Sequence, residues 1–270
     1  MKILVIGGGN MGKTYAQSFL RSHIVQTEEM MILEKSAPRA AELQKENIGN
    51  ICSSPEECLP IADLVILAVK PQDIDDLFIR LKDLVDPQQV FISIMAGIKI
   101  STIKQGLGIE KVIRAMPNLP AQIGMGMTAF TSTDEVTRIE LTMVQNLLNT
   151  TGKSIYVDKE ELLDAATAIS GSGPAYVFYC MQAFISAAKS MGFSDPEAEL
   201  LTWQTFKGAV ELFHKNDLTC EEWISRVASS GGTTEAALDF FSKENVGHRL
   251  QGGAHAARDR AIALGTEKSS

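Results

Sequence analysis

The 270-residue sequence contains few cysteines, few aromatic residues and little positive charge. Its four cysteines, Cys52, Cys58, Cys180 and Cys220, lie at spacings that match neither a CxxC redox pair nor a zinc site. We therefore expect reduced thiols, as in a cytoplasmic protein, and no metal centre. The 25 Lys and Arg residues are outnumbered by 33 Asp and Glu, which gives a net charge of −8. A nucleic-acid partner is not expected, because nothing in the sequence resembles a basic stripe.

Long hydrophobic runs are also missing, although 45% of the residues are hydrophobic. The longest apolar stretches are too short to span a bilayer, and the first residues show no extended apolar segment with a cleavage site. We therefore expect no membrane association and a cytoplasmic location. A chain of this length exceeds one typical domain, so two domains are expected.

The first twelve residues, MKILVIGGGNMG, join an apolar run to a glycine-rich turn. The run predicts a buried parallel strand, and the spacing Gly7-x-Gly9-x-x-Gly12 is typical of a dinucleotide-binding loop. A glycine turn alone can be purely structural, but the strand before it and the amphipathic segment 11–20 after it favour binding. The residues of this loop that we expect to bind the cofactor are Gly7, Gly9, Asn10, Met11 and Gly12.

Short apolar runs alternate with amphipathic segments through the first half of the chain. Such alternation predicts an α/β domain, a doubly wound parallel sheet with helices on both faces. The strands expected after the first are 30–33, 63–69, 89–94 and 111–115, with further strands at 129–131 and 154–157; the helices include 39–46, 73–84 and 134–148.

After about Lys159 the strand-like runs disappear, and an all-helical region is expected. Its predicted helices are 160–169, 175–191, 196–214, 221–228, 234–243 and 246–264. Segments 176–188 and 200–213 are apolar nearly all round, and a helix without a polar face needs a partner on each side. We therefore expect a homodimer formed by these helices.

The identity of the cofactor depends on Glu34, which follows the second strand 22 residues after Gly12. An acid there hydrogen-bonds the adenosine ribose in NAD enzymes and repels a 2′-phosphate. Lys35, Ser36 and Arg39 follow, however, and two cations with a hydroxyl group form a phosphate site if Glu34 turns away. We expect NADH to be accepted, with NADPH as the alternative. An ordinary solvated pair of Glu34 and Lys35 is the third interpretation.

Three further strands end in short loops marked by glycine or proline. The loops contain Ala68-Val69-Lys70-Pro71, Met95-Ala96-Gly97 and the segment RAMPNLP at 114–120. In open α/β sheets, ligands bind at this edge. The residues of these loops that we expect to contact the cofactor are Ala68, Val69, Lys70, Pro71, Ala96, Gly97 and Asn118.

Two glycine-rich turns open helices in the second half of the chain: SGSGPAY at 170–176 and SSGGTT at 229–234. Turns of this kind leave N–H groups unpaired and suit a small carboxylate. Plain helix capping is the other interpretation, and neither turn alone decides between them. Together with a hydride-carrying cofactor, the two turns indicate a small anionic substrate.

Five motifs, GGGNMG, AVKP, RAMPNLP, SGSGPAY and GGTT, occur in this order across essentially the whole chain. In this order and with these separations they resemble the pyrroline-5-carboxylate reductases, which catalyse the last step of proline biosynthesis. Two positions depart from the family. Ser230 stands where the family usually has proline, so this loop is expected to be less rigid. Glu34-Lys35 stands where the family often has an Asn-Arg-like pair, which puts the usual NADPH preference in doubt.

The resemblance implies an NAD(P)H-dependent oxidoreductase that reduces the C=N bond of 1-pyrroline-5-carboxylate to give L-proline. It implies a dinucleotide-binding Rossmann-type domain in residues 1–159, and an all-helical dimerisation and substrate domain in residues 160–270. Members assemble as dimers, often as rings of five dimers. No residue is an obvious strong acid, so the proton is expected from water or from an already protonated imine. The residues implied as catalytic are Thr234 and Ser229, and those implied as substrate-binding are Gly232, Thr233, Thr234, Ser172 and Gly173.

Other functions stay open at this stage. One is a reductase-like, competence-associated or cofactor-sensing paralogue without this activity, and another is a relative of the 3-hydroxyacid dehydrogenases. Intact SGSGPAY and GGTT motifs argue for catalysis, because a sensor has no need of a carboxylate pocket. A 3-hydroxyacid dehydrogenase requires a lysine general acid in the first helix of the second domain, and segment 160–169 contains no lysine.

Overall fold

The computed structural model describes residues 1–266, which form two compact units. The first comprises residues 1–172 together with the chain from Ala257, and the second comprises residues 173–256. Helix α11 (Val246–Thr266) begins in the second unit and ends in the first. The functional division at residue 159 that the sequence suggests remains a prediction.

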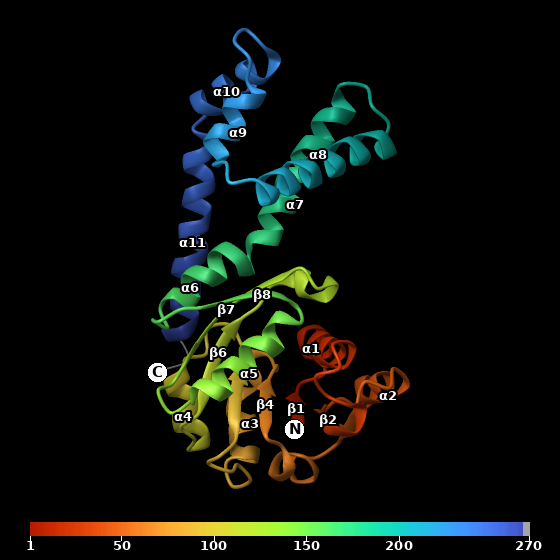
Figure 1. The fold of residues 1–270 in the computed structure, drawn as a ribbon, viewed down its shortest axis with the longest axis vertical. Coiled ribbons are helices and arrows are strands. Elements are labelled where there is room, and N and C mark those ends of the chain that lie inside the picture. Colours follow the sequence, from red (N-terminus) through yellow and green to blue (C-terminus); the bar gives the residue numbers. More distant parts are fainter. Residues whose placement is uncertain (267–270) are drawn as a thin grey trace. The chain divides into compact units, whose positions relative to one another are not determined.

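The first unit is built on an eight-stranded sheet with the order β3-β2-β1-β4-β5-β6-β7-β8 (Figure 1). The strand order reverses between β1 and β4, and doubly wound sheets bind ligands at such a switch point. The predicted doubly wound sheet is therefore confirmed. The strands are β1 (Ile3–Ile6), β2 (Met30–Leu33), β3 (Asn50–Cys52), β4 (Leu64–Leu67), β5 (Val90–Ser93), β6 (Val112–Met116), β7 (Gly126–Ser132) and β8 (Gly152–Tyr156).

Both faces of the central strands are buried, which is why these strands are continuous apolar runs. In β1, Leu4 and Ile6 belong to one core, together with side chains of α3 (Ile74–Leu81) and α4 (Ile100–Leu107). The alternate residues of β1 belong to the opposite core, with helices α1 (Asn10–Arg21), α2 (Ala37–Lys45) and α5 (Arg138–Asn149). Each fully buried Ile or Leu contributes about 2 kcal/mol.

Two strands, β7 and β8, run opposite to the other six and so depart from the all-parallel arrangement expected from the sequence. Strand β7 runs antiparallel to β6, with Met116 paired to Ala129. The connection between them contains only the short 3-10 helix η5 (Leu119–Ile123), which is too short for the crossover that a parallel pair requires. Strand β8 pairs parallel with β7 after α5 has crossed back.

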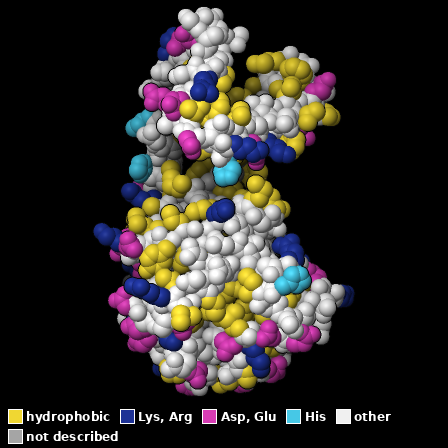
Figure 2. All heavy atoms as spheres, in the orientation of Figure 1, with side chains coloured by type: hydrophobic (Ala, Val, Ile, Leu, Met, Phe, Trp, Pro, Cys, Tyr) yellow, Lys and Arg dark blue, Asp and Glu magenta, His cyan; other side chains and the backbone are white. Residues whose placement is uncertain are grey.

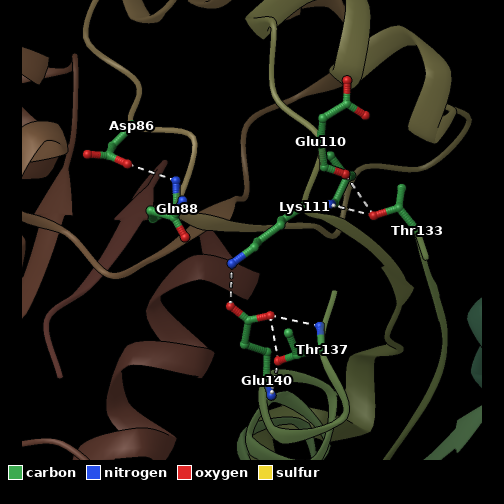
Figure 3. A network of polar contacts seen from close by, with 8 residues as sticks. Asp86, Gln88, Glu110, Lys111, Thr133, Thr137 and Glu140 are labelled. Carbon is green, nitrogen blue, oxygen red and sulfur yellow. Dashed lines mark hydrogen bonds and ion pairs between the residues drawn. The ribbon is translucent and has the colours of Figure 1, made fainter. Parts of the chain in front are cut away.

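Helix α5 is anchored to the start of β6 by the polar network in Figure 3. Lys111 Nζ donates to Glu140 Oε1 at 2.8 Å, and Thr137 donates to Glu140 Oε2 through both its N–H and its hydroxyl group at 2.8 Å. In return the Glu140 N–H donates to Thr137 Oγ1 at 3.3 Å, which completes a capping box. Burial raises the pKa of Glu140, but the hydrogen bonds from Lys111 and Thr137 outweigh burial and leave that pKa below its ordinary value.

After β8 the described chain is helical, as expected from the sequence. In the first unit it forms α6 (Leu162–Ala166) and a π-helical segment, Thr167–Gly171. The second unit contains α7 (Gly173–Ser190), α8 (Asp195–Lys215), α9 (Cys220–Val227), α10 (Thr233–Lys243) and the first part of α11. Among the described residues of α7, none is buried, and apolar side chains lie exposed over the helical region (Figure 2). No helix within residues 1–266 combines the length and hydrophobicity of a membrane span.

Candidate active site

In the first loop, glycine is needed at positions 7, 9 and 12 for different structural reasons. Gly7 has φ +103°, and a Cβ atom there would lie 2.8 Å from the Ala68 carbonyl oxygen. A Cβ atom on Gly12 would lie 2.0 Å from the Gly7 carbonyl oxygen, so only glycine allows α1 to approach this turn. Around Gly9, by contrast, no heavy atom of the described chain beyond its neighbours comes within 4 Å of such a Cβ. Gly9 therefore leaves open space in front of the first turn of α1, as a bound pyrophosphate requires.

A cavity of about 630 Å³ lies at the carboxyl ends of β1, β2 and β4. Its volume is in the usual range of ligand sites. Ile6, Leu33, Val69 and Leu77 provide apolar lining, and glycine backbone and charged side chains provide the rest. The predicted cofactor residues that line it are Gly7, Gly9, Glu34, Lys35, Ala68, Val69 and Lys70.

The remaining predicted cofactor residues lie outside the lining of this cavity: Asn10, Met11, Gly12, Pro71, Ala96, Gly97 and Asn118. Pro71 begins the 3-10 helix η4 (Pro71–Asp73), directly after the lining residue Lys70. Gly97 has φ +74°, and a Cβ there would lie 3.2 Å from Cβ of Leu264 on α11. Gly97 therefore has a packing role in this structure.

The carboxylate of Glu34 is held by two backbone N–H groups. The Gly8 N–H donates to its Oε2 at 3.0 Å, and the Ser36 N–H donates to its Oε1 at 2.8 Å. Arg39 is engaged by other groups than this carboxylate. Its Nε donates to the Gly8 carbonyl at 3.0 Å, and its guanidinium pairs with Glu42 at 2.9 Å. Glu34 is thus fixed as an acceptor on the lining of the cavity, the arrangement typical of a ribose-binding acid.

Apart from the strand ends Ile6 and Leu33, five lining residues were not expected in the site from the sequence: Gln72, Asp73, Asp76, Leu77 and Arg80. They come from η4 and α3, which follow the AVKP loop. Their spacing of three to four residues places them on one helical face, so the periodicity after Pro71 was the signal that could have identified them. What the sequence does not show is that this face turns toward the cavity.

Asn118 connects three parts of the first unit. Its Nδ2 donates to the Ser170 carbonyl at 3.0 Å, and its Oδ1 accepts from the Met127 N–H at 2.8 Å. Ser170 lies in the π-helical segment, a type of helix distortion that is frequent at functional sites. The side chain predicted to contact the cofactor thus holds the start of the SGSGPAY segment against β7 in this structure.

A buried arginine holds α6 in place next to this segment. Arg114 on β6 is only 4% exposed; it pairs with Glu160 Oε1 at 2.9 Å and with Asp164 Oδ1 at 3.1 Å. The same Glu160 oxygen accepts from the Ile100 N–H at the start of α4. The arginine of the RAMPNLP motif therefore has a positioning role, which was not assigned from the sequence.

In the second unit, the SSGGTT turn leads directly into α10. Gly231 has φ +71°, and a Cβ on Gly232 would lie 2.6 Å from Ser229 Oγ, so the predicted residues Ser229 and Gly232 are in contact. The Gly232 N–H donates to the Ser229 carbonyl at 3.0 Å. The N–H groups of Thr233 and Thr234 lie in the first helical turn, where no intrahelical acceptor exists.

A contact of Glu235 with this turn was not expected from the sequence. The Glu235 Oε2 accepts a hydrogen bond from the Gly231 N–H at 2.7 Å. Ser172 and Gly173, the other predicted substrate residues, stand where the first unit ends and the second begins. Among residues 1–266, no group of His, Cys, Asp or Glu side chains is arranged to hold a metal ion.

Comparison with known proteins agrees with this architecture. Residues 160–264 match the family model for pyrroline-5-carboxylate reductase dimerisation, and residues 2–97 match the model for coenzyme F420-dependent NADP oxidoreductase. The pyrroline-5-carboxylate reductase of Pseudomonas aeruginosa is 33% identical over 264 residues, which cover 97% of this chain and 96% of the relative.

Solved structures give the same result. The crystal structure of Plasmodium falciparum pyrroline carboxylate reductase with NADP bound has a TM-score of 0.88 at 28% identity, with 98% of both chains covered. The structure of a pyrroline-5-carboxylate reductase from Coxiella burnetii has a TM-score of 0.89 at 29% identity, with 97% of this chain and 98% of the other covered. From the nearly full-length similarity and the glycine-bordered cavity at the switch point, we conclude that this chain belongs to the pyrroline-5-carboxylate reductase family.

Proposed function

We propose that this protein is an NAD(P)H-dependent reductase that converts 1-pyrroline-5-carboxylate to L-proline. The observation that carries the proposal is the open space at Gly9 beside a cavity at the carboxyl ends of β1, β2 and β4. This is the place where a doubly wound sheet receives a dinucleotide. The full-length similarity to reductases named for this substrate supports the choice of reaction.

The chain's own groups fit the cofactor at two places. Gly9 precedes α1, whose first-turn N–H groups have no acceptor within the helix, so these groups suit a pyrophosphate placed in the open space at Gly9. Glu34 offers a fixed acceptor to the hydroxyl groups of the adenosine ribose. When bound, the nicotinamide supplies the hydride, and the protein supplies binding and orientation.

For the substrate, the start of α10 provides the anion site. The N–H groups of Thr233 and Thr234 suit the carboxylate of the cyclic imine, and the Thr234 hydroxyl group suits its ring nitrogen. Ser229 lies against this turn, and Ser172 and Gly173 are proposed as further pocket residues. None of these side chains is a strong acid, so the imine enters protonated or takes its proton from water. Catalysis then depends on holding the iminium carbon at the hydride donor.

The test is oxidation of NADH or NADPH on addition of pyrroline-5-carboxylate, compared with pyrroline-2-carboxylate and with a hydroxy acid. Thr234→Val, which keeps the shape but removes the hydroxyl group, should lower kcat about 10- to 100-fold through the loss of one hydrogen bond to a charged group. Thr234→Ser should retain most activity, and both variants should bind NADH as the wild type does. Oxidation only with the hydroxy acid, or full activity in Thr234→Val, would contradict the proposed reaction or the proposed role.

We further propose that NADH is used at least as well as NADPH. The supporting observation is the Glu34 carboxylate, whose position on the cavity lining is held by the Gly8 and Ser36 N–H groups. A negative charge there repels a 2′-phosphate and accepts from a ribose hydroxyl group. Comparing kcat/KM for the two cofactors tests this, and a large NADPH advantage would overturn it.

Assembly and location complete the proposal. Residues 160–270 are proposed to dimerise and bind substrate, with a ring of five dimers as the larger assembly; the matched dimerisation model supports a homo-oligomer. A cytoplasmic location is proposed because all four cysteines are free thiols. Sedimentation analysis and cell fractionation test these two points.

A further inference from the structure

An ion pair joins two segments that line the cavity. Lys35 follows β2, Asp73 ends η4 after β4, and Lys35 Nζ lies 2.9 Å from Asp73 Oδ1. The Lys35 side chain is 68% exposed and that of Asp73 is 35% exposed, so solvent reaches the pair. Such a pair is weak and can exchange partners.

The other cation that follows β2 is also engaged within the protein. Arg39 uses its Nε for the Gly8 carbonyl and its guanidinium for Glu42. Within residues 1–266, Lys35 is therefore the cation of this segment that pairs with one partly exposed side chain and with no backbone group. Asp73, in contrast, is held in place, because Pro71 begins η4 and the Asp73 N–H donates to the Lys70 carbonyl at 2.9 Å.

We propose that Asp73 is a cofactor-specificity residue: by pairing with Lys35, it withdraws the ammonium group that would otherwise bind the 2′-phosphate of NADPH. The inference rests on the proposed function, since it requires a nicotinamide dinucleotide in this cavity. The preference for NADH over NADPH then depends on two carboxylates, that of Glu34 after β2 and that of Asp73 after β4.

The Asp73 carboxylate and a 2′-phosphate compete for one cation, Lys35. A 2′-phosphate carries up to two negative charges, and Lys35 is the cation after β2 that is held only by a solvent-reached ion pair. To obtain it, the phosphate must displace the Asp73 carboxylate and then remain beside two carboxylates of the same sign. NADH has only a hydroxyl group at this position and leaves the pair intact. Because the pair is exposed, the effect is modest and decreases with added salt.

The experiment uses the full chain and measures the Kd of NADH and of NADPH by nicotinamide fluorescence, without substrate. Asp73→Asn keeps the shape and removes the charge. We expect it to tighten NADPH binding about three- to tenfold, as for a released surface cation, and to change NADH binding less than about twofold. Lys35→Met should abolish this gain when combined with Asp73→Asn.

Asp76→Asn is the matched control. Asp76 lines the same cavity from the next turn of α3 but makes no ion pair within the described chain. It should shift NADPH affinity much less than Asp73→Asn does. The proposal is overturned if Asp73→Asn leaves NADPH binding unchanged, if Asp76→Asn gives an equal gain, or if the gain survives Lys35→Met.

Different results would refute the proposed function and the proposed role of Asp73. A wild-type protein that binds dinucleotides but does not oxidise them with the imine refutes the reaction, while the ratio of the two Kd values still tests Asp73. A wild-type protein that binds neither dinucleotide refutes both.

Discussion

At the residue scale, Gly9 differs from the neighbouring glycines in what an added methyl group would meet. Its φ of −67° suits any residue, and its Cβ would project into open space. We therefore expect Gly9→Ala to change the free energy of unfolding by less than about 0.5 kcal/mol. The same methyl group occupies the space needed by a pyrophosphate, so cofactor affinity should fall about tenfold or more. Thermal unfolding and fluorescence titration measure the two effects separately.

Gly12→Ala provides the contrasting variant. Its Cβ would lie 2.0 Å from the Gly7 carbonyl oxygen, so the turn itself must shift, at a cost of about 1–3 kcal/mol in stability. If Gly9→Ala destabilised the protein as much as Gly12→Ala and left cofactor binding intact, Gly9 would be a structural glycine and the cofactor would have to lie elsewhere.

Asn118 allows its two hydrogen bonds to be tested one at a time. Asn118→Asp keeps the acceptor for the Met127 N–H but replaces the donor to the Ser170 carbonyl by a repelling oxygen. We expect this variant to lose about 1–2 kcal/mol of stability. Its KM for the imine should rise more than its Kd for NADH, because the π-helical segment before Ser172 is released. A rise in the Kd for NADH alone would instead support direct contact of Asn118 with the cofactor.

At the element scale, burial explains which features could be predicted from the sequence. Strands β1, β2 and β4 are buried on both faces, so their continuous apolar runs were enough to predict them as strands. Strand β3 has only three residues, and two of them are not buried. Its hydrophobic pattern was therefore too weak to predict a strand. Helix α4 was also missed, although its buried residues Ile100, Ile103 and Leu107 have the spacing of one helical face.

Features of the candidate site also differ in whether the sequence could predict them. The glycine loop and Glu34 were predictable because their roles depend on local sequence, namely a turn and a strand end. The pairing of Lys35 with Asp73 depends on how two loops 38 residues apart face each other. The π-helical segment depends on contacts of Asn118 and on Met116, which lies near Gly171. Tertiary contacts of this kind leave no periodic pattern in the sequence.

The capping box of α5 predicts a pH dependence of stability. The folded-state pKa of Glu140 is lowered, so its stabilising contribution is complete above the ordinary value of 4.5 and is lost as pH falls through the lower folded value. Glu140→Gln should therefore lower stability near neutral pH and flatten the loss of stability that sets in as the pH falls below the ordinary value of 4.5. Urea unfolding at a series of pH values measures this, with the exposed Glu161→Gln as control. An equally steep acid limb in Glu140→Gln would show that Lys111 and Thr137 do not stabilise the carboxylate.

At the scale of the whole molecule, the second unit exposes many large apolar side chains. On α7, which is apolar nearly all round, Phe178 is 59% exposed, and on α8, which also carries charged residues, Val210 is 64% exposed. Exposed large apolar side chains in such number are typical of an interface. Since the matched family model describes dimerisation, a second copy of the chain is the expected cover. Stability should then depend on protein concentration, because folding of these helices is coupled to association.

Single charges placed on this surface test the expected dimer. Phe178→Glu and Val210→Glu should each shift the protein from dimer toward monomer in sedimentation velocity, because a buried unpaired carboxylate costs several kcal/mol at an interface. Ile79→Glu is the control: Ile79 is 77% exposed on α3 of the first unit and outside the helical surface, so its replacement should leave the assembly unchanged. Reductase activity should fall with the dimer population if the pocket requires both copies. A wild-type monomer that retains full activity would separate catalysis from this surface and leave the exposed apolar side chains of α7 and α8 to another partner.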